Sequence, residues 1–357
     1  MTKYVLLKFI IVSGLGLFFQ GNSFVKTNVF SDYGNPKTAD TLDFDDGPYL
    51  FIYNDSLVKK TIINGKVETK VLQPEAAKTE FAPENSTFTN VTKIAALSDI
   101  HGQYDLLITL LKNNKIIDEN LNWAFGNGHF VIVGDIFDRG SEVTEVLWLV
   151  YNLEQQALKS GGKVHYILGN HEYMVLQNDL RYIHKKYWQT SKALQTNYDE
   201  LFNTETLLGR WLRSKPTMVK INDILFVHGG ISEEFIAQGF NLEATNEIMR
   251  KSLYMDKRDM QWDSIYGGYF DSNGPIWYRG YFSEDFKKAC LNKLLRKLDV
   301  KHIVVGHTSQ TQVKSLFNNK LFAVDSSIKN GSYGEILIVE NKTYYRGTLE
   351  GEKIQLD

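Results

Sequence analysis

Five short segments of the chain place carboxylate, imidazole or amide side chains beside glycine or another small residue. They are Ser98-Asp99-Ile100-His101-Gly102, Gly134-Asp135-Ile136-Phe137-Asp138-Arg139-Gly140, Gly169-Asn170-His171-Glu172, Val227-His228-Gly229-Gly230 and Gly306-His307-Thr308. Carboxylate, imidazole and amide groups are ligands that suit Zn, Fe, Mn and similar ions. The neighbouring glycines allow the sharp turns and close backbone approach that a bound ion or phosphate requires. Together the segments indicate a metal site.

A single segment of this kind is a weak signal. Asp-x-His-Gly occurs often by chance, and an isolated histidine at a strand end is usually structural. Five such segments that each follow an apolar run favour one shared site. In Asp99-Ile100-His101 the two polar side chains project toward the same edge, because residues i and i+2 of an extended chain share a face.

The apolar runs before these segments predict buried strands. They are short, rich in Val, Ile, Leu and Phe, and bounded by turn residues; they span 93–99, 130–135, 164–170, 224–228 and 303–307. Helical patterns over 104–113, 142–160 and 286–298 lie between several of them. Alternating strands and helices indicate an α/β protein with ligands at the carboxyl ends of the strands. Runs at 321–324, 335–339 and 344–346 predict closing antiparallel strands.

Two insertions interrupt this pattern. Residues 173–218 are rich in aromatic and basic residues and are predicted to be helical, and residues 231–280 contain Trp262, several tyrosines and Gly267-Gly268. Neither insertion resembles a further core strand. Both are placed to wall a cleft at the strand ends.

The N-terminal region predicts an exported protein. Residues 1–23 have the pattern of a secretory signal, with Lys3 and Lys8 before an apolar run and small residues at its end. We therefore expect a secreted or periplasmic protein, with a retained membrane anchor as the alternative. Residues 24–90 form an extension in which Asn64-Gly65 predicts a β-hairpin, since both residues tolerate positive φ. The catalytic domain is expected to span 91–357, with the insertions inside it.

The composition excludes some partners. The 357 residues are 43% hydrophobic and 23% charged, with a formal net charge of -2. This balance is ordinary for a globular protein and gives no overall attraction to nucleic acid or to anionic membranes. We expect no nucleic-acid partner and no membrane contact beyond the N-terminal segment. An anionic substrate must be attracted by charge within the site.

The order of the motifs resembles that of the calcineurin-like metallophosphoesterase superfamily. The shared pattern is Asp-x-His, Gly-Asp, Gly-Asn-His and two later histidine motifs. Asp138-Arg139-Gly140 is similar to the signature of the phosphoprotein phosphatase branch, and the segment 274–280 resembles the Pro-x-Trp-x-Arg stretch of bacterial Shewanella-like phosphatases. The resemblance covers residues 91 to about 345. It departs at Ser98, where the branch usually has glycine.

The resemblance implies a two-sheet α/β sandwich flanked by helices, an αββα arrangement with metals at the carboxyl ends of the strands. It also implies two metal ions, of Mn, Fe or Zn. Asp99 and His101 would bind the first ion and Asp135 would bridge both, while the second would be completed by Asn170, His228 and His307. His171 would be the general acid, oriented by Asp138, and Arg139 would bind the phosphoryl oxygens.

The chemistry expected of such a site is phosphoester hydrolysis. Two adjacent cations lower the pKa of a bridging water, and the resulting hydroxide attacks phosphorus in line with the ester oxygen. His171 would protonate the leaving oxygen. A dianionic monoester favours a second arginine, for which Arg279 is the candidate. The alternative for Arg279 is stacking on Trp277 or Tyr281.

These features predict a metal-dependent phosphomonoester hydrolase that acts on phosphorylated protein, at Tyr or Ser/Thr, or on small phosphomonoesters. One alternative is a diadenosine-polyphosphate or phosphodiester hydrolase, which shares Asp-Arg-Gly but would have cytoplasmic substrates. Another is a non-catalytic binding protein, against which the complete ligand set argues.

Glu172 is interpreted as a helix-start residue. Weaker phosphate-binding candidates are Arg181, Arg210 and Arg213, and structural histidines are His129, His165, His184 and His302.

Overall fold

The computed structural model describes residues 44–53, 56–77, 79–255, 259–260, 263 and 266–356. The expected signal segment, most of the linker that follows it, and Trp262 lie outside these residues. Within the described ranges, no helix is long and apolar enough to cross a membrane. Export of the chain therefore stays a prediction from the sequence.

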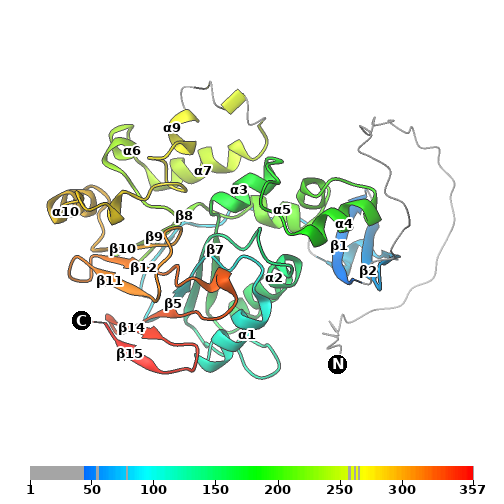
Figure 1. Ribbon diagram of the computed structural model, residues 1–357, viewed down its shortest axis with the longest axis horizontal. Coiled ribbons are helices and arrows are strands. Elements are labelled where there is room, and N and C mark those ends of the chain that lie inside the picture. Colours follow the sequence, from blue (N-terminus) through cyan, green and yellow to red (C-terminus); the bar gives the residue numbers. More distant parts are fainter. Residues whose placement is uncertain are drawn as a thin grey trace.

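Two six-stranded sheets pack face to face, as the α/β sandwich prediction requires (Figure 1). The first sheet has the order β15-β14-β13-β5-β6-β7, and the second has the order β11-β12-β10-β9-β8-β4. The strands of the first are β5 (Lys93–Leu97), β6 (His129–Val133), β7 (Lys163–Ile167), β13 (Ile336–Glu340), β14 (Thr343–Gly347) and β15 (Lys353–Gln355). Those of the second are β4 (Thr87–Phe88), β8 (Met218–Ile221), β9 (Ile224–Val227), β10 (His302–Val305), β11 (Lys314–Leu316) and β12 (Leu321–Ala323).

The central strands are apolar on both faces, which explains their unbroken hydrophobic runs. In β5, Ile94 and Ala96 face the second sheet, whereas Ala95 and Leu97 face the helices. Strands β5, β6 and β7 are parallel, as are β9 and β10. Because parallel strands end at the same edge, the segments that follow them converge there.

Helices cover the outer faces of both sheets. Helices α1 (Tyr104–Asn113) and α2 (Val143–Lys159) pack on the first sheet, and α6 (Glu233–Ala237) and α10 (Lys288–Lys297) pack on the second. The bounds of α1, α2 and α10 confirm the three predicted helices within two residues at each end, whereas α6 was not predicted.

The insertions are mainly helical. They contain α3 (Asn170–Leu176), α4 (Lys185–Leu194), α5 (Leu207–Arg213), α7 (Leu242–Ser252), α9 (Gly267–Phe270) and the short 3-10 turn η2 (Asp199–Phe202). Other 3-10 turns are η1 (Pro74–Ala76), η3 (Gly280–Phe282) and η4 (Ile328–Asn330).

Two expectations about strands were wrong. The first insertion was assigned no strand, yet its last residue, Met218, begins β8, which pairs antiparallel with β9 through a tight turn at Asn222. The run at 321–324 was expected to be antiparallel, but β12 runs parallel to β10 and antiparallel only to β11. In both cases the pairing depends on where the chain returns to the sheet, which local sequence does not encode.

The N-terminal extension forms its own three-stranded sheet of β1 (Asp46–Tyr53), β2 (Ser56–Ile63) and β3 (Lys66–Leu72). The predicted hairpin is confirmed between β2 and β3, and Asn64 and Gly65 have φ of 49° and 72°, as a type I′ turn requires. Strand β1 was not predicted separately. The sheet lies beside α4, at the far end of the molecule from α10 (Figure 1).

A buried hydrogen-bond network attaches this sheet to the segment after Gly140. The hydroxyl of Tyr187 on α4 accepts from the Val143 amide (2.7 Å) and donates to the Ser141 carbonyl (3.0 Å). Asp46 of β1 accepts from Thr190 on the same helix (2.5 Å). The network therefore links β1, α4 and the loop that carries Arg139.

Substitution Tyr187→Phe should lower the free energy of unfolding by about 1–3 kcal/mol, because the buried Val143 amide and the partly buried Ser141 carbonyl lose their partner. Urea unfolding followed by circular dichroism measures the change. The matched control is Tyr53→Phe at a residue that is 49% exposed, which should change stability by no more than about 0.5 kcal/mol. Equal effects of the two substitutions would contradict this account.

Candidate metal centre

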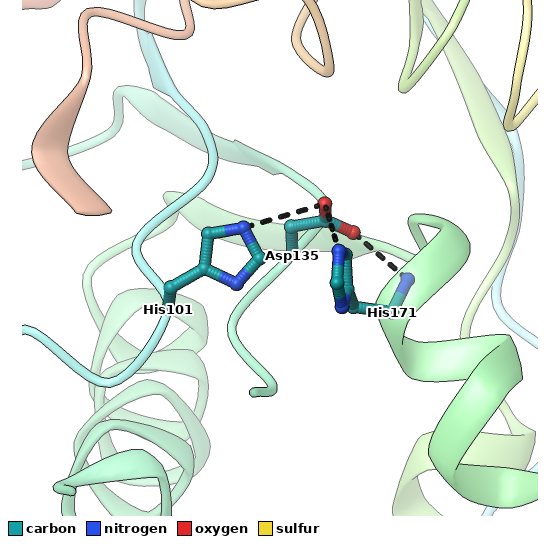
Figure 2. A group of neighbouring side chains, drawn as sticks. All are labelled: His101, Asp135 and His171. Carbon is teal, nitrogen blue, oxygen red and sulfur yellow. Dashed lines mark hydrogen bonds and ion pairs between the residues drawn. The ribbon is translucent and has the colours of Figure 1, made fainter. Parts of the chain in front are cut away.

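The polar segments singled out in the sequence meet at the carboxyl edge of the two sheets. Asp99 and His101 follow β5, Asp135 follows β6, Asn170 follows β7, and His228 and His307 follow β9 and β10. All six side chains are buried. Figure 2 shows His101 and His171 directed at Asp135 from either side. The structure thus brings every predicted ligand to one place.

The backbone at this edge is strained. Asp99, His101, Asp135 and His307 have positive φ, between 46° and 62°. Such a conformation costs on the order of 1 kcal/mol for a residue other than glycine, and it persists only where the surroundings enforce it. Here it turns side chains from separate strands toward a common point.

Asp135 is the centre of the cluster. Its Oδ2 lies 3.2 Å from His228 Nε2, 3.6 Å from His101 Nε2 and 3.9 Å from His171 Nε2. Two groups with metal-binding geometry share it: one with His101 and His171, the other with His228 and His307. In each group the ligand atoms lie within 4.8 Å of one another. One carboxylate between two groups is an arrangement that suits a pair of ions.

Backbone carbonyls orient the imidazoles. His101 Nδ1 donates to the Phe137 carbonyl (2.6 Å), and His228 Nδ1 donates to the Val133 carbonyl (2.7 Å). With Nδ1 bound to a carbonyl, Nε2 of each ring faces Asp135, as for a metal-binding histidine. Asn170 Oδ1 lies 2.9 Å from His228 Nε2, and His307 Nε2 is buried with no hydrogen-bond partner among the described residues. The donor set and this unpartnered nitrogen both fit bound cations.

Asp99 is held from two sides. Its Oδ2 accepts from the Ser98 hydroxyl (2.6 Å) and from the His307 amide (2.9 Å), while its Oδ1 lies 3.9 Å from His101 Nε2. Ser98, the departure from the resembled pattern, therefore contributes a hydrogen bond to the predicted ligand. Neither three-residue group includes Asp99. In the group that contains His101 and Asp135, the third member is His171.

Electrostatics at the site favour cation binding. Burial, together with Asp325 and Asp135, raises the pKa of Asp99 to about 8. Burial lowers the pKa of His101 to about 3 and that of His307 to about 2, so both imidazoles are neutral, the form that binds metals. Although burial opposes its charge, Asp135 raises the pKa of His228 to about 10. A bound cation would stabilise the carboxylates and displace the proton from His228.

His171 is paired with Asp138. Its Nδ1 lies 2.5 Å from Asp138 Oδ2, and its Nε2 lies 3.4 Å from Arg139 Nη2. Burial acts to lower the pKa of His171, but Asp135 and Asp138 outweigh it and raise the pKa above the usual value. His171 thus presents a polarised Nε2 next to an exposed guanidinium.

Two arginines stand at the mouth of the site. Arg139 is exposed, and its Nε lies 3.3 Å from His101 Nε2. Arg279 is also exposed, and its Nη1 donates to the His307 carbonyl (2.7 Å). Arg279 borders a cavity of about 630 Å³ that lies between 270 and 280 in the second insertion. All residues that line this cavity belong to the insertion itself, so the expectation that the insertions wall a cleft at the strand ends stays a prediction.

The remaining candidates lie in other contacts. Arg181 forms a bidentate pair with Asp179, Arg210 contacts Glu80, and Arg213 donates to the Gly209 carbonyl.

The four histidines interpreted as structural have structural contacts: His129 with His165, His184 at the start of α4 and His302 with the Asn319 carbonyl. None of them belongs to the two metal-binding groups found among the described residues.

Glu172 does more than begin a helix. Its buried carboxylate accepts from the amides of Gly169 (2.6 Å), Asp135 (2.8 Å) and Ile136 (2.7 Å). It thus satisfies the N-cap amide of α3 at Gly169 and also holds the loop that carries Asp135. Its place three residues after Gly169 was a signal for the cap, but not for the second contact.

Asp325 is a buried carboxylate near the site that sequence reasoning missed. It accepts from the Ser309 hydroxyl (2.7 Å) and the Ser327 amide (3.0 Å), and its charge contributes to the raised pKa of Asp99. It directly follows the apolar run of β12, which was the available signal.

Comparisons with known proteins agree with this geometry. A family model described as calcineurin-like phosphoesterase matches residues 92–310. Shewanella-like protein phosphatase 1 of Plasmodium berghei is 31% identical over 245 residues, which cover 66% of this chain and 67% of that protein. Shewanella-like protein phosphatase 2 of Arabidopsis thaliana is 26% identical over 292 residues, covering 68% and 73%. A crystal structure of the cold-active protein-tyrosine phosphatase of a psychrophilic Shewanella species matches with a TM-score of 0.85 and 44% identity, over 88% of this chain and 100% of that one.

Substitution Asp135→Asn should reduce the metal content of the purified, Mn-reconstituted protein to less than half of the wild-type value, because the ligand common to both groups loses its charge. Elemental analysis by mass spectrometry measures the content. His302→Asn, at a histidine outside both groups, serves as the control and should bind as much metal as wild type. Unchanged metal content in Asp135→Asn would show that the cluster is not the metal centre.

Proposed function

The chain belongs to the calcineurin-like phosphoesterase family and is a metal-dependent phosphatase, and we propose that its substrates are phosphorylated proteins, with phosphotyrosine among them. The observation that carries this proposal is the pair of exposed arginines, Arg139 and Arg279, on either side of the buried Asp135 cluster. The similar Shewanella protein is a protein-tyrosine phosphatase by name, and the structural match covers all of that chain.

For the metals, we propose that Asp135 bridges two ions. Asp99 and His101 would hold the first, and His228, Asn170 and His307 would hold the second, with Mn, Fe or Zn as the candidate metals. The unpartnered His307 Nε2 and the neutral imidazoles support this assignment. When bound, such ions lower the pKa of water and neutralise charge on the phosphoryl oxygens.

Arg139 and Arg279 would bind the terminal phosphoryl oxygens. Each guanidinium presents several fixed donors, and two such groups complement the charge of a phosphate monoester dianion. A diester carries a single negative charge and leaves one arginine unmatched. The presence of both Arg139 and Arg279 therefore supports a monoester substrate.

His171 would act as the general acid. Asp138 holds Nδ1, so the proton available to substrate is the one on Nε2, which faces Arg139 (3.4 Å) at the mouth. A leaving oxygen placed beside the arginine-bound phosphoryl group lies within reach of this proton. Protonation of this kind contributes about 10²–10⁴-fold to the rate.

The substrate class is tested by comparing p-nitrophenyl phosphate with bis(p-nitrophenyl) phosphate, each assayed after reconstitution with Mn, Fe and Zn. The monoester should have a kcat/KM at least about tenfold higher, since two arginines then bind a dianion and the tenfold ratio corresponds to about 1.4 kcal/mol. Preference for the diester would support the diester or dinucleotide alternative. Turnover of neither ester by metal-loaded protein would support the non-catalytic alternative.

The role of His171 is tested by His171→Ala. We expect kcat to fall by about 10²–10⁴-fold, because the leaving oxygen loses its proton donor. Metal content should stay near that of wild type, and His302→Ala should retain both metal and activity. If His171→Ala loses metal together with activity, the residue is a ligand of the first ion, in keeping with its place in the group of His101 and Asp135.

A further inference from the structure

We propose that Tyr182 determines specificity for the leaving group, forming an aromatic wall against which an aryl phosphate packs, so that phosphotyrosine is preferred to alkyl phosphates such as phosphoserine. This inference rests on the proposed function. It adds which leaving group of a phosphomonoester the site would prefer.

Tyr182 lies beside the two residues assigned to the phosphoryl group and the leaving oxygen. Its ring centroid is 5.5 Å from that of His171, with an angle of 58° between the planes. The Cζ atom of Arg139 lies 5.6 Å from the Tyr182 ring centroid. The Tyr182 carbonyl accepts from the Arg139 amide (2.9 Å), which ties this part of the first insertion to the Asp138-Arg139 loop.

The ring is accessible despite these contacts. Tyr182 is 45% exposed, among the most exposed large apolar side chains in the described chain. Arg181, whose side chain is 65% exposed, also lies over the ring, with its Cζ atom 5.6 Å from the ring centroid. The part of the ring that these two guanidinium groups leave exposed is available to a ligand. Exposed aromatic rings of this kind provide rigid contact area at a low cost in conformational entropy.

The in-line geometry of the reaction places the leaving group on the side of the site where Tyr182 lies. In an in-line displacement the leaving oxygen lies opposite the attacking oxygen and next to the general acid. His171 Nδ1 is held by Asp138, so the leaving oxygen must approach Nε2, the atom 3.4 Å from Arg139. Because Tyr182 contacts both His171 and Arg139, the substituent on that oxygen meets its ring.

An aryl substituent gains more from this contact than an alkyl one. Aromatic pairs with centroids 4.5–7 Å apart contribute about 0.5–1.5 kcal/mol beyond area burial, and the ring of phosphotyrosine is bonded directly to the leaving oxygen. The single methylene of phosphoserine offers little surface at that position. Trp277, two residues before Arg279, instead packs against His307, with ring centroids 5.6 Å apart.

A competing role for Tyr182 is to position Arg139 through the cation–π contact. Loss of the ring would then weaken binding of every phosphoryl ligand by the same factor. Selectivity between aryl and alkyl ligands therefore separates the two roles, whereas overall activity does not.

The test is titration calorimetry of the Mn-loaded full-length protein with phenylphosphonate and methylphosphonate. Wild type should bind phenylphosphonate more tightly, and Tyr182→Leu should reduce the ratio of the two affinities by about three- to tenfold, as expected for loss of an aromatic pair. Tyr182→Phe should keep the ratio. Trp188→Leu, at a residue of the same insertion that is 55% exposed on α4, is the matched control and should also keep it.

Two results would overturn the proposal. One is a wild-type protein with no preference for phenylphosphonate. The other is a Tyr182→Leu protein whose ratio is unchanged, whether affinity for both ligands falls equally or not at all. Because binding is measured without turnover, failure of the proposed phosphatase function would appear separately, as metal-loaded protein that hydrolyses no phosphomonoester.

Discussion

The buried carboxylate of Asp135, surrounded by imidazoles, governs how the other parts of the site are arranged. Removing a carboxylate from water carries a large desolvation penalty unless opposite charge or hydrogen bonds compensate it. Here His228 and His101 approach one oxygen, the His171 amide binds the other, and Glu172 fixes the backbone of the same loop. Neighbouring residues at this edge adopt positive φ to maintain the arrangement. The site thus stores backbone strain that the surrounding contacts maintain, and this strain keeps the side chains directed at one point.

The sandwich architecture is what allows this arrangement to form. Asp135 belongs to the first sheet and His228 to the second, so neither sheet alone contains both parts of the centre. His228 donates to the carbonyl of Val133, the last residue of β6, which joins the sheets at their carboxyl edge. The apolar layer between the sheets therefore sets the separation of the ligands. Packing errors in that layer would be transmitted directly to the metal centre.

The sequence predicted those parts of the molecule that depend on local pattern. Each apolar run before a ligand segment became a buried strand, and the Asn64-Gly65 turn formed the hairpin that its backbone preference indicates. Pairing between distant segments was less predictable: β8 was missed, and β12 runs opposite to expectation along β10. The contact of Glu172 with the Asp135 loop depends on tertiary packing and has no local signature. The apolar run before Asp325 marks a strand end, but not that this carboxylate is buried beside the site. The candidate ligands could thus be located from the sequence more readily than the residues that orient them.

The first insertion provides a physical link between the edge of the sheets and the surface that meets substrate. Tyr182 binds the Arg139 amide through its carbonyl, and Tyr187, five residues later, holds Ser141 and Val143 on the other side of that loop. Arg139 itself has φ of 66°, so its loop requires support from outside its own strand. Helix α4 supplies that support and is in turn anchored to the N-terminal sheet through Asp46 and Thr190. The extension that precedes the catalytic strands is therefore part of what positions Arg139, although none of its described residues is a candidate ligand.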